Sequence, residues 1–225
     1  MQARIVAIVL CSFAGAASAQ VGTSMGLLDA NSATEAELRG ANVDAAVVSK
    51  IVAGRPFASA TALDEALAAT VAEPQREQLY GRLFVTINLN TASRAEILLI
   101  PGLNERMAHE FEEYRPYTSL EQFRREIGKY VPPAEVARLE QYVFVPMNLN
   151  SASDAAFMTI PRMTQRMVHE FEEYRPYTSF EQFRREIGKY VDASEVARLE
   201  QYVFVPLKLN SATPDALLTI PGMTN

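Results

Sequence analysis

One sequence unit of about 60 residues occurs three times in this chain, and the first part of the same unit occurs a fourth time. Asn90, Asn150 and Asn210 each open a stretch of the form Leu-Asn-(Thr/Ser)-Ala-(Ser/Thr), and Ile-Pro follows about ten residues later. Residues 109–131 and 169–191 differ at one position only, Leu120 against Phe180. Such a repeat predicts one supersecondary unit that was copied, so fold and function have to be argued for each copy.

The repeat divides the chain into segments. An older copy, which shares the Asn-Ser-Ala-Thr opening at Asn31, spans residues 27–87, and the two close copies span residues 88–147 and 148–207. Residues 208–225 reproduce only the opening of a unit. Because half a unit cannot bury its own apolar face, we expect this last segment to be a truncated module.

The first 19 residues have the pattern of a secretory signal peptide. Arg4 precedes an apolar run of about 13 residues, and Ala-Ser-Ala ends the segment at Ala19. This pattern predicts cleavage before Gln20 and a periplasmic or secreted protein. The apolar run is too short to cross a bilayer, which takes about 20 residues, and we expect no membrane span elsewhere.

The charge balance argues against strong binding to duplex nucleic acid. The first copy holds 8 acidic and 5 basic residues, and each of the next two holds 9 acidic and 7 basic residues. Nucleic-acid-binding domains usually carry a basic surface, and no copy is basic. Cys11 is the only cysteine and lies in the signal segment, so we expect no thiol chemistry in the mature protein.

Each copy is predicted to form four short helices and little else. In the second copy, Ser93 with Glu96 fits a capping box, and Pro101 ends the helix that begins there. Thr118 with Glu121 is predicted to be a further capping box, and Pro132-Pro133 to start the fourth helix. The segment 142–146 has the composition of a strand, but its length and proline indicate an edge or a linker rather than a sheet. A core of this size is marginal, so we expect the modules to pack on each other or on a partner.

The opening Leu-Asn-Thr-Ala-Ser with Ile-Pro-Gly, followed by a helix and Arg-Pro-Tyr-Thr-Ser-Leu-Glu-Gln-Phe, resembles the tandem helix-hairpin-helix domain of ComEA-type competence proteins. Those proteins are exported DNA receptors. The same domain is similar to that of the extrinsic lumenal subunit of photosystem II, which is a protein-binding module. The resemblance covers each full repeat. It implies an all-α fold of tandem four-helix modules with two hairpins each.

The family's DNA contact is a Gly-apolar-Gly hairpin whose backbone amides bind phosphate at the start of the second helix. Here the four hairpins diverge. The first reads Asn-Val-Asp, so a carboxylate at Asp44 occupies the place of a phosphate, and we expect no DNA binding there. The resemblance predicts phosphate contacts in the other three copies, together with nearby cations, at Gly102, Leu103, Asn104, Arg106, Arg124, Arg125, Lys129, Arg162, Thr164, Arg166, Arg184, Arg185, Lys189, Gly222 and Thr224.

Each of these features has a structural alternative. The arginines alternate with glutamates at helical spacing, so ion pairs within helices, worth about 0.2 to 0.5 kcal/mol each, would explain them without a ligand. Asn90, Asn150 and Asn210 are expected to satisfy nearby backbone groups. Tyr114, Tyr117, Tyr130 and Tyr142 could stack on single-stranded bases, but three of them continue the apolar periodicity and are expected to seal the core.

No catalytic or cofactor-binding pattern is present in the sequence. His109 and His169 stand in identical settings, and only the glutamate four residues further on faces each of them, which predicts solvated helix surface and no metal site. We therefore expect a protein that is not an enzyme and has no cofactor. Two functions remain open: weak, sequence-independent DNA binding by an exported repeat protein, and a cell-envelope protein-interaction or structural module that has lost DNA binding.

Overall fold

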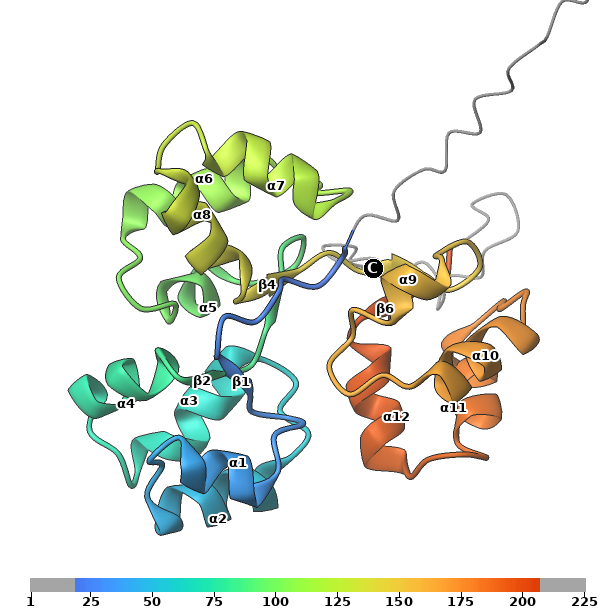
Figure 1. Cartoon of the computed structure of the whole chain (residues 1–225), viewed down its shortest axis with the longest axis horizontal. Helices are drawn as coiled ribbons and strands as arrows, with labels where there is room; N and C mark the ends of the chain where they lie inside the picture. The colour runs from blue at the N-terminus through green and yellow to red at the C-terminus, as the bar shows by residue number, and fades with distance from the viewer. Residues whose placement is uncertain (1–18, 207–225) are drawn as a thin grey trace, which may run out of the picture.

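A computed structural model describes residues 19–206 of the chain (Figure 1). The predicted signal segment up to residue 18 and the partial fourth module at 208–225 lie outside these residues. In the described part, three helical modules surround a centre in which short strands and the N-terminal segment meet (Figure 1).

Each module contains four short helices that form two hairpins, which confirms the predicted all-α fold class. The helices are α1 Glu35–Gly40, α2 Ala45–Gly54, α3 Ala60–Ala68 and α4 Glu73–Tyr80 in the first module; α5 Arg94–Leu98, α6 Glu105–Glu113, α7 Leu120–Ile127 and α8 Pro133–Glu140 in the second; α9 Asp154–Phe157, α10 Gln165–Glu173, α11 Phe180–Ile187 and α12 Ala193–Glu200 in the third.

Local signals set most of the helix starts. The capping box of Ser93 and Glu96 is present at α5, and α8 begins at Pro133 with Pro132 as its N-cap. The predicted box of Thr118 and Glu121 is wrong. Ser119 is the N-cap of α7 and accepts from the Gln122 amide, while the Gln122 side chain reaches back to the Thr118 amide. The cap therefore lies one residue later than the sequence pattern indicates.

Two-residue strands close each module. β1 Leu28–Asp29 pairs with β2 Leu83–Phe84, β3 Ile87–Asn88 with β4 Val143–Phe144, and β5 Met147–Asn148 with β6 Val203–Phe204, all three in parallel. The segment predicted to be an edge or linker is thus half of a small sheet. The partner strand is the start of the same module, about 56 residues earlier, and no local pattern indicates that pairing.

An asparagine and an arginine hold the middle of each module to its start. The Asn90 side chain donates to Tyr117 O at 2.9 Å and accepts from Tyr117 N at 2.6 Å. Arg115 donates to Leu89 O and to Ala92 O, both at 2.6 Å. Equivalent bonds join Asn31 to Phe57 and Asn150 to Tyr177. The expectation that these asparagines act locally is therefore wrong, because their partners lie 26 or 27 residues away; Asn210 is outside the described residues.

Neighbouring modules pack through an aromatic pair, as the small size of each core predicts. The Tyr142 ring of the second module packs edge-on against Phe84 of the first, and its hydroxyl donates to Tyr80 O. Tyr202 of the third module packs against Phe144 of the second at the equivalent position, with tilted rings whose centroids lie 4.7 Å apart. The N-terminal segment also joins modules, since Val21 lies opposite Phe144 and its amide donates to Thr159 of the third module.

The third module returns to the first and completes the arrangement around the centre (Figure 1). Arg162 forms an ion pair with Glu37, and the Gln201 side chain donates to Phe57 O. Arg198 is 2% exposed, and the charge of Asp29 in the first module acts on it. None of the described helices is long and apolar enough to cross a membrane.

Candidate nucleic-acid interface

The first hairpin of every module has the same backbone geometry at its tip. Asn42, Gly102 and Arg162 occupy equivalent positions and have φ angles of 55°, 76° and 61°. Left-handed backbone is natural for glycine, tolerated by asparagine and unfavourable for arginine. The tip geometry is therefore kept in all three copies, although only the second copy keeps the residue that suits it best.

The second glycine position of the family pattern holds a helix cap instead. Asn104 has extended backbone, and its side chain accepts from the Met107 amide at 3.0 Å; Thr164 caps α10 in the same way. Leu103 donates its amide to Ile100 O. Within the described residues, the amides of Glu105 and Arg106 at the start of α6 make no hydrogen bond, so they are the groups that a phosphate could reach.

The tips of the second and third modules lie beside acidic groups of the first module. A cavity of about 380 Å³ separates residues 98–103 from the first module, where it is lined by Glu73, Arg76 and Glu77 of α4 and by Asp64 of α3, which is paired with Arg76. Arg162 at the third tip is paired with Glu37. A hydrogen bond from the Thr34 amide, together with that ion pair, lowers the pKa of Glu37 to about 2. The negative charge beside the third tip is thus retained at any ordinary pH.

Arg106 and Arg166 follow the tips on exposed positions of α6 and α10. Within the described residues Arg106 has no ion pair, and the Arg166 guanidinium lies 5.9 Å from the centre of the Tyr190 ring. Both arginines therefore keep donors for a ligand. The sequence-based alternative of pairing within a helix does not account for them.

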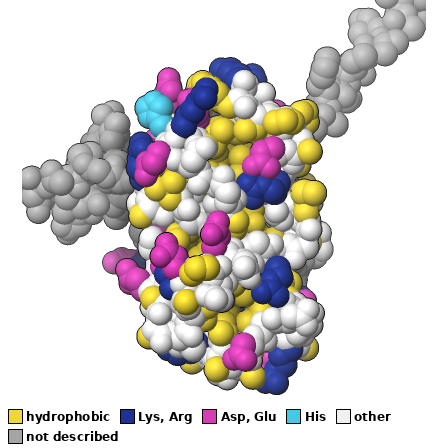
Figure 2. Space-filling model, turned by 90° about the vertical axis from the view of Figure 1, so that its left-hand side faces the viewer, with side chains coloured by type: hydrophobic (Ala, Val, Ile, Leu, Met, Phe, Trp, Pro, Cys, Tyr) yellow, Lys and Arg dark blue, Asp and Glu magenta, His cyan; other side chains and the backbone are white. Residues whose placement is uncertain are grey.

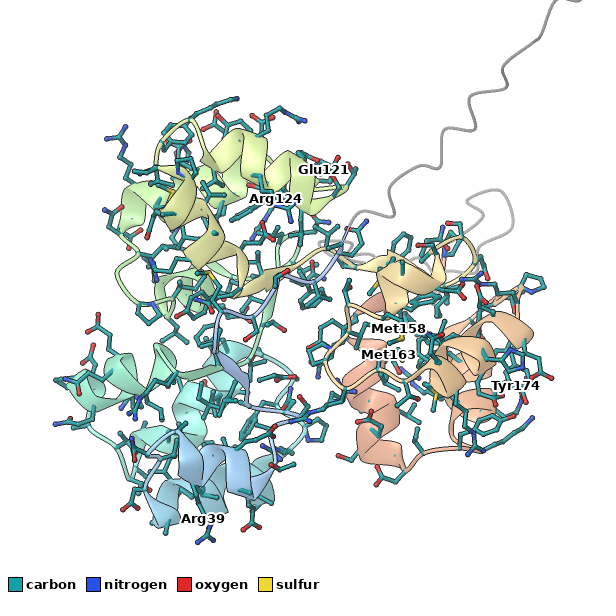
Figure 3. The ribbon with its side chains drawn as sticks, viewed as in Figure 1. Arg39, Glu121, Arg124, Met158, Met163 and Tyr174 are labelled. Carbon is teal, nitrogen blue, oxygen red and sulfur yellow. The ribbon has the colours of Figure 1, made fainter. Side chains whose placement is uncertain are left out.

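The cations predicted at the second hairpin are paired with glutamates. Arg124 donates to both carboxylate oxygens of Glu140 at 2.5 and 2.7 Å, and Arg184 does the same to Glu200. These pairs join two helices, α7 with α8 and α11 with α12, whereas the structural alternative drawn from the sequence was pairing within one helix. Figure 3 shows Arg124 on α7, close to Glu121. Each guanidinium is still about half exposed, at 44% and 56%.

Arg125 and Lys129 share one carboxylate. Both contact Glu126, and the hydrogen bonds from Lys129 and Arg125 lower the pKa of Glu126. Arg185 and Lys189 share Glu186 in the same manner. All four cations remain exposed, with side-chain exposures between 52% and 67%. Such exposed pairs contribute little to stability and can exchange for other anions.

Two tyrosines bring the hairpins of one module together. In the third module the hydroxyls of Tyr174 and Tyr190 lie 2.8 Å apart, Lys189 lies 4.9 Å from the Tyr174 ring centre, and Arg166 lies over Tyr190. Tyr174 is on the outer side of this module (Figure 3). The second module repeats the arrangement with Tyr114, Tyr130 and Lys129, the two hydroxyls being 2.7 Å apart.

We call these two clusters the cation–tyrosine faces; they are Arg106, Tyr114, Lys129 and Tyr130 in the second module and Arg166, Tyr174, Lys189 and Tyr190 in the third. The expectation that the tyrosines seal the core holds for Tyr117 and Tyr142, which are 2% exposed. It is wrong for Tyr130, which is 37% exposed and available for stacking.

The first module lacks the whole cluster. Its residues at the four positions are Ala46, Gly54, Ala69 and Thr70, so it offers neither cations nor aromatic rings there. Its tip carries Asp44, which caps α2 by accepting from the Ala46 amide. The second and third modules therefore share a polar, aromatic surface that the first module lacks.

The surface as a whole is mixed in charge. On the face seen in Figure 2, acidic and basic side chains are interspersed between apolar ones. His109 and His169 are exposed, as the sequence predicts, and each lies 3.6 Å from the glutamate four residues later. Among residues 19–206, no three acidic, histidine or cysteine side chains gather as metal ligands.

Residues 83–143 match the helix-hairpin-helix motif family. The match spans the second module and begins with the last strand of the first. It suggests DNA binding as a function for this part of the chain. No curated protein matches the sequence significantly, and no solved structure does so either. The resemblance to the competence proteins therefore stays a prediction.

The predicted phosphate contacts stay predictions too, and the structure shows where they lie. Arg166 and Lys189, which belong to different hairpins, lie beside the same tyrosine pair of the third module. In the second module Lys129 lies beside the equivalent pair, and Arg106 holds the position of Arg166 on α6. Gly222 and Thr224 are outside the described residues. Sequence reasoning missed the tyrosine pairs as surface groups; their signal was that the first module lacks both tyrosines and the neighbouring cations together.

Proposed function

We propose that this chain is an exported, non-enzymatic DNA-binding protein whose second and third modules contact phosphate without regard to base sequence. The observation that carries the proposal is the pair of cation–tyrosine faces. In each, a lysine of the second hairpin lies over one ring of a tyrosine pair, and in the third module Arg166 of the first hairpin lies over the other ring. The second module, where Arg106 holds the position of Arg166, matches the helix-hairpin-helix motif family. Cations supply phosphate contacts, and an exposed ring such as Tyr130 can stack on an unpaired base.

Repetition compensates for weak single contacts. Each module carries more acidic than basic groups, and most cations have a glutamate partner. A single face is therefore expected to bind weakly. Two equivalent faces on one chain raise the apparent affinity for a long polymer, because the second contact forms at high local concentration.

Titration of labelled single- and double-stranded DNA at low and moderate salt tests the proposal. The test variant replaces Arg106 and Arg166 with alanine. The charge-matched control replaces Arg39 and Lys50, which are exposed and belong to the first module, the one without such a face. We expect the test variant to lose most of the binding and the control to keep it. In a plot of the logarithm of the association constant against the logarithm of the salt concentration, the magnitude of the slope should decrease by about 0.9 for each duplex phosphate contact removed.

Equal losses in both variants would show that net charge alone is responsible, and an absence of binding at low salt would reject DNA as the ligand. Export is tested separately by the mass of the protein recovered from the producing cell. The proposal expects a chain that begins at Gln20.

A second candidate, a protein-interaction or structural module of the cell envelope, is favoured by the surroundings of the hairpin tips. Arg162 is paired with Glu37, and Gly102 lines a cavity together with Glu73 and Glu77 of α4, so two of the three tips face the first module. If DNA fails to bind at low salt while the modules remain folded, this function replaces the first.

A further inference from the structure

The outer edge of β4 already binds an extended segment. Gly22 N donates to Val143 O at 3.0 Å, and Val145 N donates to Gln20 O at 2.8 Å. Between these bonds Val21 lies opposite Phe144 in antiparallel orientation. Residues 20–22 thus extend the β3–β4 pair by one short strand.

The edge selects the residues that it binds. An aliphatic side chain at Val21, which is 4% exposed, helps to cover Phe144, which is 3% exposed. The next residue has to be glycine, because a Cβ on Gly22 would lie 1.7 Å from Glu140 O. The recognised pattern is therefore one residue with a free carbonyl, then an aliphatic residue, then glycine.

The third module carries the same edge without this segment. Residues 195–206 are identical in sequence to residues 135–146, and β6 pairs with β5 in the register of β4 with β3. Within residues 19–206, neither Val203 O nor Val205 N has a hydrogen-bond partner. Phe204 is 41% exposed, whereas Phe144, which Val21 and the Tyr202 ring cover together, is 3% exposed. An exposed strand edge with an uncovered aromatic ring is a site for strand addition.

We propose that the β6 edge is a peptide-binding site that takes an extended, antiparallel segment with an aliphatic residue followed by glycine, the chemistry of Val21 and Gly22. The aliphatic residue covers Phe204, and the peptide backbone bonds to Val203 O and Val205 N. The partner is another protein that offers such a segment. This inference concerns a surface remote from the cation–tyrosine faces and does not depend on DNA binding.

Amide chemical shifts of the full chain, measured while a capped peptide of residues 19–25 is added, test the proposal. We expect saturable shifts at Phe204 and Val205 that are absent with the peptide in which Gly22→Ala is made. The protein variant Phe204→Ala should weaken the binding several-fold, and because this ring is exposed, the variant should stay folded.

Three results would overturn the assignment. One is the absence of saturable shifts at millimolar peptide, and another is equal binding of the alanine peptide. The third is a set of shifts at Val205 that depends on protein concentration without any peptide, since a second copy would then occupy the edge. Shifts confined to Val143 and Val145, which would reflect exchange of the chain's own N-terminal segment, count with the first result.

Discussion

At the scale of single residues, the fold depends on a few polar side chains that bridge distant parts of a module. Asn90 satisfies both backbone groups of Tyr117, and Arg115 donates to two carbonyl groups just before α5. Burial lowers the pKa of Arg115, which shows that its charge is partly desolvated. Buried polar groups of this kind are costly to leave without partners.

Replacement of Asn90 by aspartate should destabilise the second module. The carboxylate keeps an acceptor for Tyr117 N but cannot donate to Tyr117 O, so a buried carbonyl loses its partner at a cost of about 2 kcal/mol. The matched control is Asn104→Asp, in which a carboxylate serves equally well as the N-cap of α6. Urea denaturation should show a lower midpoint for the first variant only; equal midpoints would contradict the bridging role.

Glu37 should become protonated only at a pH far below the range in which glutamate side chains usually titrate. Its pKa is about 2 in the folded chain, mainly because the Thr34 amide donates to it and secondarily because of Arg162. A lowered pKa stabilises the fold above the ordinary value near 4.5, and this contribution is lost as the pH falls toward 2. In a carboxyl NMR titration, Arg162→Ala should raise the pKa only part of the way, since the bond from Thr34 persists. A full return to the ordinary value would contradict the dominance of the cap.

At the scale of helices and turns, the sequence predicts what depends on neighbouring residues. The capping box at Ser93 and the helix start at Pro133 are both short-range signals, and the structure confirms them. The pairing of β3 with β4 and the bridge from Asn90 to Tyr117 join residues far apart in the chain, so no local pattern reveals them. The tip at Arg162 is an intermediate case. Its left-handed backbone could be predicted from the sequence only through its alignment with Gly102 in the preceding copy.

The Arg162 tip gives a test of backbone strain. Arg162→Gly and Arg162→Ala both remove the ion pair with Glu37, but only glycine is at ease at a φ of 61°. The glycine variant should be more stable than the alanine variant by about 1 kcal/mol, as judged by thermal unfolding. Gly102→Ala should lower the stability of the unchanged protein by a similar amount. If the members of each pair have the same unfolding temperature, the tips are not strained.

The same variants distinguish two modes of phosphate binding. If the amides at the tip bind phosphate, Arg162→Gly should keep or improve DNA binding relative to Arg162→Ala. If the side-chain charge is responsible, both variants should bind equally weakly. The comparison uses the salt titration already described, with the two proteins at equal concentration.

At the scale of the whole molecule, the modules differ in what they contribute. The first supplies Phe84 for Tyr142, Glu37 for Arg162 and the carbonyl of Phe57 for Gln201, yet it lacks a cation–tyrosine face. The second and third carry the faces and use the first as a platform. Near-identity of the copies therefore does not imply identical surroundings, because each copy meets a different neighbour.

Arg138 and Arg198 provide a test of how the surroundings of equivalent residues differ between the copies. They are equivalent residues with the same ion pair, to Glu135 and Glu195, but the side chain of Arg138 is 32% exposed and that of Arg198 is 3% exposed. Arg198 is buried, and its charge acts on Asp29 of the first module. Burial raises the pKa of Asp29, while hydrogen bonds from Asn31 and Ser32 and, to a smaller extent, the charge of Arg198 lower it. Arg198→Ala should therefore destabilise the chain by about 2 kcal/mol or more, since it leaves a carboxylate in a poorly solvated place.

Arg138→Ala should lower the free energy of unfolding by less than about 1 kcal/mol, as expected for a partly exposed ion pair. Hydrogen exchange read at α1 and α12 would show whether the loss opens the contact between the first and third modules or only the end of α12. Faster exchange at both helices in Arg198→Ala alone is the expected outcome. Equal effects of the two substitutions would mean that the third module does not rest on the first through this arginine.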